Sequence, residues 1–394
     1  MPVPVPTSSP PRARADACPG ALLTHAAADG ALARVRVPGG LLSAGQLRLL
    51  AAAARELGDG ALELTSRGNV QLRGLRPGAG QELGGRLAAA GLLPSATHER
   101  VRNVLASVLS GRTPGGSADV RAWVSAFDAA LCADPLLAEL PGRFLATFDD
   151  GRGDVVGLGG DVGVLALDPG TVALTLGGTD SGIRVPPAEA VGVALAATRA
   201  FLAERADQGG AAWRLAELVD GAARVTTRLG GASTGPMALP AAPGAGPAGA
   251  VHQLDGRTAL VAVVPLGRLT AAQADLLAAT SAAPQITPWR SVALPDLPDA
   301  AAAAALAAAG LVLDGASPWL QVTACAGRPG CAKSLADVRA DAASAVASGA
   351  LPADGGRQHW AGCERRCGRP SGPVADVVAT GTGYRIDLPR AEKS

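Results

Sequence analysis

An internal repeat constrains the fold of this 394-residue chain more than any other feature of its sequence. Three segments of the first half recur in the second half in the same order, at offsets of 227, 222 and 219 residues. The offsets are too regular to follow from an alanine-rich composition alone, so the chain is predicted to contain a duplicated unit. The matching pairs are Val37–Leu50 with Val264–Leu277, Leu64–Leu72 with Ile286–Leu294, and Leu87–Leu93 with Leu306–Val312.

Each copy is expected to run strand, helix, strand, helix. β-Branched runs that end at proline predict the first strand, Ser or Thr N-caps predict a helix, and apolar–polar alternation predicts the second strand. Such a unit is α+β and ferredoxin-like. The residues concerned are Ala31–Val37, Ser43, Leu62–Leu72 and Gly91 in the first copy, and Thr258–Val264, Thr270, Ile286–Leu294 and Gly310 in the second.

Four of the six cysteines form two pairs near the end of the chain, with thirty-one residues between the pairs. Cys325 and Cys331 are spaced C-x5-C, and Cys363 and Cys367 are spaced C-x3-C. A cubane iron–sulfur cluster needs four thiolates that converge from more than one loop, and both segments are rich in glycine. Structural zinc pairs normally lie two to four residues apart, so zinc fits x5 less well. Unliganded thiols are the remaining alternative.

The overall composition argues against several classes of function. The net charge is +1, the pI is about 7.7, and no Lys/Arg-rich block occurs, which argues against a nucleic-acid-binding protein. Met1–Pro11 has no apolar core of the signal-peptide type, and the apolar run Ala300–Leu313 is too short to span a bilayer. We therefore expect a cytoplasmic protein that is not membrane-bound, in which clustered cysteines bind metal more often than they form disulfides.

The cysteine motif resembles that of the nitrite/sulfite reductase superfamily. Within that superfamily, three segments resemble the sequences of the precorrin-3B synthase family. They are His359–Pro370 (HWAGCERRCGRP), Ala17–Gly20 and Arg34–Gly40. The resemblance extends from Cys18 to Asp387. It implies a sulfite-reductase-like pseudo-twofold architecture: duplicated ferredoxin-like half-domains, and two α/β segments that bind the cluster and a tetrapyrrole.

The expected organisation follows from the repeat and the resemblance together. The boundaries are 1–17 for a disordered tail, 18–98 for half-domain 1, 99–235 for an α/β substrate-binding domain, 236–250 for a Pro/Ala/Gly-rich linker, 251–315 for half-domain 2 and 316–390 for a [4Fe–4S] domain. Further expected helices are Arg121–Ala133, Pro187–Ala206 and Leu335–Ser348. Further expected strands are Gly142–Phe148, Asp154–Leu167, Val172–Leu176, Ala375–Ala379 and Gly383–Asp387.

The resemblance also implies an activity. Members of the precorrin-3B synthase family are monooxygenases of aerobic cobalamin biosynthesis, which use O2 to hydroxylate precorrin-3A at C20 and close a γ-lactone. The implied cofactors are a [4Fe–4S] cluster and a mononuclear non-haem iron, with no sirohaem, and the implied electron donor is a ferredoxin or an NAD(P)H-linked reductase. The iron's ligands stay unassigned, because the sequence contains no His-x-Asp/Glu pair of the usual oxygenase type.

Site residues are carried over from the same resemblance. The four cysteines are expected to hold the cluster, and His359 is expected to adjust it through a hydrogen bond. The substrate's carboxylates call for guanidinium groups, for which we assign Arg67, Arg102 and Arg143, with Asn103 at the substrate rim. Within the repeat, Val322–Cys325 corresponds to Val104–Ser107, so cysteines in one half face arginines in the other. The turn Asp149–Gly151 is interpreted as a plain turn.

Two other functions remain open. In the reductases a second basic residue lies where this chain has Leu145, which has no proton to donate. A small sirohaem-dependent nitrite or sulfite reductase is therefore the second hypothesis. The third is a non-catalytic Fe–S or zinc protein that binds no tetrapyrrole.

Overall fold

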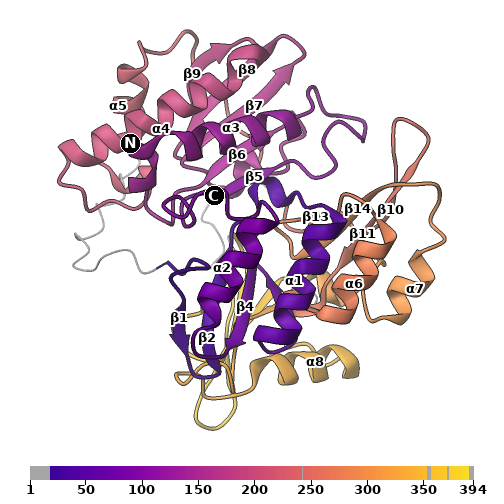
Figure 1. Ribbon diagram of the computed structural model, residues 1–394. Helices are drawn as coiled ribbons and strands as arrows, with labels where there is room; N and C mark the ends of the chain where they lie inside the picture. Colours follow the sequence, from indigo (N-terminus) through magenta and orange to yellow (C-terminus); the bar gives the residue numbers. More distant parts are fainter. Residues whose placement is uncertain (1–17, 242, 353–355, 371, 390–394) are drawn as a thin grey trace. The chain divides into compact units, whose positions relative to one another are not determined.

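A computed structural model describes residues 18–241, 243–352, 356–370 and 372–389, and it confirms a mixed α+β fold (Figure 1). The tail predicted at 1–17 lies outside the described residues. The described chain forms two compact units. Unit 1 comprises Arg36–Gly39 and the described part of Pro94–Ala242, and unit 2 comprises Pro19–Val35, Gly40–Leu93 and the described part of Pro243–Ser394. Each unit is considered by itself below.

The first ferredoxin-like half lies in unit 2. Its antiparallel sheet has the strand order β1-β2-β4-β3, and β12 from the second half joins at the edge beside β3. Ser43 caps helix α1 through a capping box with Gln46, so the predicted N-cap is confirmed. The elements are β1 (His25–Ala27), β2 (Gly30–Val35), α1 (Ala44–Leu57), β3 (Ala61–Leu64), β4 (Val70–Leu75) and α2 (Ala79–Ala89).

The second half repeats this arrangement with the sheet order β10-β11-β14-β13. Thr270 caps α6 with the same capping box, to Gln273, and α1 and α6 lie side by side (Figure 1). The elements are β10 (Gly249–His252), β11 (Thr258–Val263), β12 (Arg268–Thr270), α6 (Ala271–Thr280), β13 (Gln285–Ile286), β14 (Ser291–Leu297) and α7 (Ala303–Ala308).

The two halves match at the level of single hydrogen bonds. Gln46 Nε2 donates to the Ala90 carbonyl at 3.0 Å, and Gln273 Nε2 donates to the Ala309 carbonyl at 2.8 Å. The contacts between the halves are reciprocal as well. The Ala44 amide donates to Ala282 at 2.9 Å, while the Ala271 amide donates to Gly60 at 3.0 Å. The repeat seen in the sequence is therefore a pseudo-twofold relation inside unit 2.

The predicted single strands Leu62–Leu72 and Ile286–Leu294 are wrong, because each is a hairpin of two strands. The turns depend on a threonine hydroxyl. Thr65 Oγ1 accepts the Asn69 amide at 3.1 Å, and Thr287 Oγ1 accepts the Ser291 amide at 3.3 Å. The first half therefore runs strand, strand, helix, strand, strand, helix, and the second half follows the same order with the short strand β12 added before α6.

The cysteine-bearing end of unit 2 forms a separate four-stranded sheet with the order β15-β16-β17-β18. Strands β15, β16 and β17 are parallel, and β18 pairs antiparallel with β17. Helix α8 contacts β15 and β16. The elements are β15 (Val322–Ala324), α8 (Val338–Ser348), β16 (Gln358–Ala361), β17 (Ala375–Ala379) and β18 (Tyr384–Asp387).

Unit 1 contains a five-stranded sheet of order β5-β6-β7-β8-β9 with three helices. Helix α3 has the predicted bounds, whereas β7 starts eight residues later than predicted, because Gly151–Leu158 forms turns around Asp149. Neither β9 nor α5 was predicted. The elements are β5 (Val104–Ala106), α3 (Arg121–Ala133), β6 (Ala146–Asp149), β7 (Val162–Asp168), β8 (Thr171–Leu176), β9 (Thr179–Val185), α4 (Ala190–Asp207) and α5 (Gly221–Arg228).

Within the described part of the chain, none of the helices combines the length and apolar character needed to cross a bilayer.

Candidate metal centre

The two cysteine pairs of unit 2 meet because they follow neighbouring parallel strands. Ala324 at the end of β15 is in register with Trp360 on β16. Cys325 follows β15 directly, and Cys363 follows β16 after one glycine. The carboxyl ends of adjacent parallel strands lie at one edge of the sheet, so both loops leave from the same place.

Backbone hydrogen bonds lock the two loops together. The Cys325 amide donates to the Trp360 carbonyl at 3.0 Å, and the Gly362 amide donates to Cys325 Sγ at 3.2 Å. Glycine is required at 362, since a Cβ there would lie 1.9 Å from the Ser334 hydroxyl oxygen. The first loop therefore packs against the backbone of the second.

The C-x5-C loop is wrapped tightly and held from outside. The Cys331 amide donates to Gly327 at 2.8 Å, and Gly327 adopts a left-handed φ of +68°. Arg73 of β4 donates to the Gly330 carbonyl at 2.6 Å and forms an ion pair with Asp29 at 2.9 Å. The first ferredoxin-like half thus supports the loop between Cys325 and Cys331.

The Cys367 thiol lies within electrostatic reach of the other three thiols. Burial raises the pKa of the Cys367 thiol, and the charges of Cys325, Cys363 and Cys331 add to that increase, although Arg365 opposes it. In a tetrahedron around one zinc ion, thiolates at about 2.3 Å from the metal are about 3.8 Å apart.

Asp149, Asp150 and Asp154 form a group of potential metal ligands whose donor atoms all lie within 4.8 Å of one another. Among the described residues, no group of three or more ligands this close together includes a cysteine. No three of the four cysteine sulfurs therefore lie as close together as a single tetrahedral zinc ion requires.

Buried polar atoms beside the cysteines support the same interpretation. Among the described residues, His359 Nε2 and Trp360 Nε1 are buried without a hydrogen-bond partner. Burial lowers the pKa of His359 to about 3, with a contribution from Arg290, so the ring is neutral at ordinary pH. Thr323 Oγ1 holds the other ring nitrogen, Nδ1, at 3.0 Å. Four cysteines from two adjoining loops, with the His359 ring beside the Cys367 backbone, form a donor set that fits a [4Fe–4S] cluster.

Arginines surround the cysteine loops, and sequence reasoning missed the most informative ones. Arg339 Nε donates to the Cys325 carbonyl at 3.2 Å while its Nη2 contacts Glu63 at 2.6 Å. Arg290 Nη2 donates to the Gly368 carbonyl at 2.9 Å. Burial lowers the pKa of Arg290 to about 10, so it remains charged at neutral pH. The repeat held a signal for Arg290, because it stands where the first half has Gly68.

A cavity of about 70 Å³ lies on the β15 and β16 side of unit 2. Trp289 and Trp319 supply apolar walls, while Arg290 and Arg357 supply charge. Thr323 and Gln358, on neighbouring strands of the cysteine sheet, also line it.

The predicted substrate arginines fall in both units. Arg67 lies in the β3–β4 turn of unit 2, and its amide donates to Thr65 Oγ1 at 3.3 Å. Arg102 lies in unit 1, where Asp128 binds two of its nitrogens at 2.7 Å each. This ion pair fixes the Arg102 side chain, of which only 4% is exposed.

Asn103 and Arg143 are connected within unit 1. Asn103 is buried, and its Nδ2 donates to the Gly142 carbonyl at 3.0 Å. Arg143 is exposed, and its guanidinium lies 5.9 Å from the centroid of the Trp213 ring. Asn103 therefore positions the loop that presents Arg143. Leu145, next but one along the chain, is buried.

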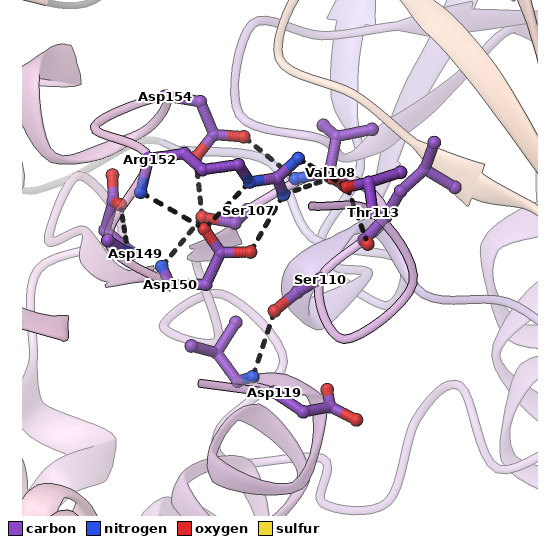
Figure 2. A network of polar contacts seen from close by, with 12 residues as sticks. Ser107, Val108, Ser110, Thr113, Asp119, Asp149, Asp150, Arg152 and Asp154 are labelled. Atoms are coloured by element: carbon purple, nitrogen blue, oxygen red, sulfur yellow. Dashed lines mark hydrogen bonds and ion pairs between the residues drawn. The ribbon is translucent and has the colours of Figure 1, made fainter. Parts of the chain in front are cut away.

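Unit 1 repeats the strand-end geometry of the cysteine site without cysteines. The Ser107 amide donates to Phe148 at 3.0 Å, as Cys325 does to Trp360. The Asp150 amide donates to Ser107 Oγ at 2.9 Å, as Gly362 does to Cys325 Sγ. Figure 2 shows the polar network that fills this place, with Arg152 paired to Asp150 at 2.8 Å.

The carboxylates of this network are saturated. Asp149 accepts four backbone amides, and Asp154 accepts the Ser107 hydroxyl at 2.5 Å and the Val108 amide at 3.0 Å. Every carboxylate oxygen of Asp149, Asp150 and Asp154 therefore already has a partner inside the protein, and we assign no metal to them. The turn expected at Asp149–Gly151 is present.

Comparisons with known proteins agree with this geometry. Residues 25–90 match the nitrite/sulfite reductase ferredoxin-like half domain. The chain is 29% identical over 403 residues to a ferredoxin–nitrite reductase of Synechococcus elongatus, covering 90% of this chain and 77% of that protein. It is 28% identical over 389 residues to a precorrin-3B synthase of a Sinorhizobium species, covering 95% of this chain and 82% of that protein.

A solved structure extends the comparison to the fold. The NirA protein of Mycobacterium tuberculosis superposes with a TM-score of 0.73 at 24% identity, covering 91% of this chain and 74% of that one. The α+β fold expected from the repeat is thereby confirmed. The resemblance carried by the cysteine motif, to precorrin-3B synthase within the nitrite/sulfite reductase-like proteins, is confirmed as well.

Proposed function

We propose that this protein is a cluster-containing oxidoreductase that acts as a precorrin-3B synthase. The reaction would be the O2-dependent hydroxylation of precorrin-3A at C20 with γ-lactone formation, a step of aerobic cobalamin biosynthesis. The observation that carries the proposal is the convergence of Cys325, Cys331, Cys363 and Cys367 from the ends of two parallel strands. The similarity to a precorrin-3B synthase over 95% of the chain supports the choice of substrate.

In this proposal the cofactors and the side chains have separate roles. A bound cluster would relay single electrons, and a non-haem iron, whose ligands we do not assign, would supply oxygen chemistry. Arg67 and Arg143 would bind acetate and propionate groups of the tetrapyrrole, because a guanidinium matches a carboxylate at any relevant pH. Within unit 1, Asn103 and the Arg102–Asp128 pair would position the Arg143 contact.

The electron donor in this proposal is a ferredoxin or an NAD(P)H-linked reductase. Its support is indirect, since one of the similar proteins is named a ferredoxin–nitrite reductase. The proposed compartment is the cytoplasm, where thiols stay reduced and free to bind metal.

Anaerobic purification with iron and sulfide analysis tests the cofactor directly. We expect about four sulfides and about five irons per chain, four in the cluster and one as the mononuclear iron, with a broad brown absorption. Cys363→Ser should remove the cluster and the conversion of precorrin-3A, whereas Cys132→Ser on α3 should preserve both. Full cluster content in the Cys363 variant would exclude the ligand assignment.

A sirohaem-dependent nitrite reductase is the second candidate, favoured by the similarity to the Synechococcus elongatus enzyme over 90% of the chain. The same preparation separates the two functions. Sirohaem would give an intense Soret-type band and nitrite-dependent oxidation of a reduced ferredoxin, whereas the synthase should show neither. A zinc or non-catalytic protein would bind no tetrapyrrole in a titration with a uroporphyrinoid.

A further inference from the structure

The turn that carries Arg290 is strained where its duplicate is not. Arg290 has a φ of +58°, in the left-handed region that side chains with a Cβ rarely adopt. At the equivalent turn of the first half the residue is Gly68, with a φ of +64°. The two turns share their hydrogen bonds, since Gly68 donates to Thr65 at 3.1 Å and Arg290 donates to Thr287 at 3.2 Å. An arginine is thus kept at a position where glycine would be unstrained.

The Arg290 side chain extends toward the second cysteine loop. It passes over Gly267, where an added Cβ would lie 2.6 Å from Arg290 Cδ. Its Nη2 then donates to the carbonyl of Gly368, the residue after Cys367, at 2.9 Å. Arg290 also acts electrostatically on His359, whose ring lies beside the Cys367 backbone. Its charge is therefore placed at the edge of the cysteine site.

Arg290 differs from the other arginines around this site in its charge balance. Arg339, Arg366 and Arg369 form ion pairs with Glu63, Asp387 and Asp376 respectively. Among the residues that the structure describes, no carboxylate lies within ion-pair distance of Arg290. Glu63 attracts it from further away, while Arg339 and Arg357 repel it. Surrounding a cation with protein in this way costs several kcal/mol unless an anion compensates it.

We propose that Arg290 is the electrostatic counterpart of the iron–sulfur cluster and raises the cluster's reduction potential. The inference rests on the cluster assigned above to the four cysteines. A [4Fe–4S] core with four thiolates is anionic, and it gains one more negative charge when it accepts an electron. A fixed positive charge beside it stabilises the reduced form more than the oxidised form.

A redox titration of the anaerobically purified protein, followed optically and by electron paramagnetic resonance, tests the proposal. Arg290→Gln removes the charge and keeps a shorter polar side chain, and Arg290→Lys retains the charge. In the Gln variant we expect the oxidised form to be favoured about tenfold, which lowers a one-electron midpoint potential by about 59 mV. The Lys variant should stay close to the wild type. Arg76→Gln is the matched control, because Arg76 is exposed and already paired with Glu82.

Arg290→Gly separates charge from structure. It relieves the left-handed strain, so thermal stability should be unchanged or higher, while the potential should fall as in the Gln variant. If Arg290 serves only folding, Arg290→Gly should lower the thermal stability and leave the reduction potential unchanged. Unchanged reduction potentials in both the Gln and the Gly variant would overturn the proposal. If both the Gln and the Gly variant lose the cluster, the Arg290→Lys variant decides between the two explanations. A Lys variant that keeps the cluster supports the role of the charge, and a Lys variant that loses it refutes that role. A wild-type protein without iron or sulfide would instead refute the cofactor assignment itself.

Discussion

At the scale of single residues, one strand-end position shows how a side chain decides what a loop can hold. Cys325 and Ser107 both follow a parallel strand and both accept an amide from the neighbouring strand's loop. Ser107 also donates to Asp154, so its place is filled by carboxylates of the same unit. Cys325 instead lies close enough to Cys367 for the two thiols to interact electrostatically. The serine site is therefore internally complete, whereas the cysteine site is suited to an inorganic core.

Asp154 gives this network a pH dependence. Burial, with the charge of Asp149, raises the pKa of Asp154 from 3.8 to about 6 in the folded protein. Between these pH values the folded state binds more protons than the unfolded state. The contribution of Asp154 to the free energy of unfolding is therefore complete below pH 4 and is lost as the pH rises through 6. The slope reaches about 1.4 kcal/mol per pH unit. Asp154→Asn, which imitates the protonated form, should flatten this part of the profile.

Urea unfolding of wild type and variant between pH 4.5 and 7.5 measures the effect. Asp168→Asn, at an exposed position of the same unit, is the control and should leave the profile unchanged. Parallel profiles for wild type and Asp154→Asn would show that the carboxyl titrates normally.

Some features of single residues could be predicted from the sequence, and others could not. The N-caps Ser43 and Thr270 could be predicted, because their signal lies in local spacing and residue type. The assignment of the four cysteines as ligands uses the same kind of signal and stays a prediction. Arg290 and Asp154 could not be predicted. Their roles depend on a left-handed turn and on a buried charge balance, which arise only when distant segments pack together.

At the scale of elements, strand β4 supports the cysteine loop. Arg73 projects from β4 with only 8% of its side chain exposed and contacts both Asp29 and the Gly330 carbonyl. Arg73→Gln would leave Asp29 without its cation, and breaking a buried pair typically costs about 3–5 kcal/mol. We expect a lower melting temperature and faster bleaching of the cluster in air.

Arg76, three residues further along, supplies the matched comparison for this strand. It pairs with Glu82 at 3.0 Å, with 58% and 44% of the two side chains exposed. Exposed pairs of this kind contribute about 0–1 kcal/mol, so Arg76→Gln should change neither observable appreciably. Equal effects of the two substitutions would mean that β4 does not brace the loop.

Element boundaries were predictable where the apolar pattern is unbroken. Helix α3 was predicted at its observed bounds, Arg121–Ala133. The hairpins of the repeat were not, because the Thr65 turn continues the strand-like alternation of the residues around it. Strand β9, Thr179–Val185, escaped prediction for a different reason, since its polar residues and Gly182 give a weak β pattern and its pairing with β8 supplies the missing stability.

At the scale of the whole molecule, duplication could be predicted from the sequence but the fit between the copies could not. The copies in unit 2 meet through a reciprocal pair of bridges. Leu41 pairs with Gln285, and Glu63 pairs with Arg268. Each residue of one bridge is the repeat equivalent of a residue in the other. Contacts of this kind tie the stability of the two copies to each other, and they depend on glycines whose importance no sequence pattern reveals.

Gly40 is the most demanding of these glycines. It has a φ of +69°, and an added Cβ would lie 1.8 Å from the Ile286 carbonyl oxygen of the other copy. Gly267, its repeat equivalent, has a φ of +70°, but its Cβ would first meet the flexible Arg290 side chain at 2.6 Å. Gly60, with a φ of +81° and open space around it, isolates the conformational strain from the close approach.

The three alanine substitutions should therefore rank by what the new methyl group meets. We expect losses of about 1 kcal/mol for Gly60→Ala, about 1–3 for Gly267→Ala and about 3–5 for Gly40→Ala, measured by urea unfolding. A backbone carbonyl cannot rotate away as a side chain can, so Gly40→Ala must separate the copies and destabilise both. A Gly40 variant no less stable than the Gly60 variant would mean that the copies do not pack against each other through this turn.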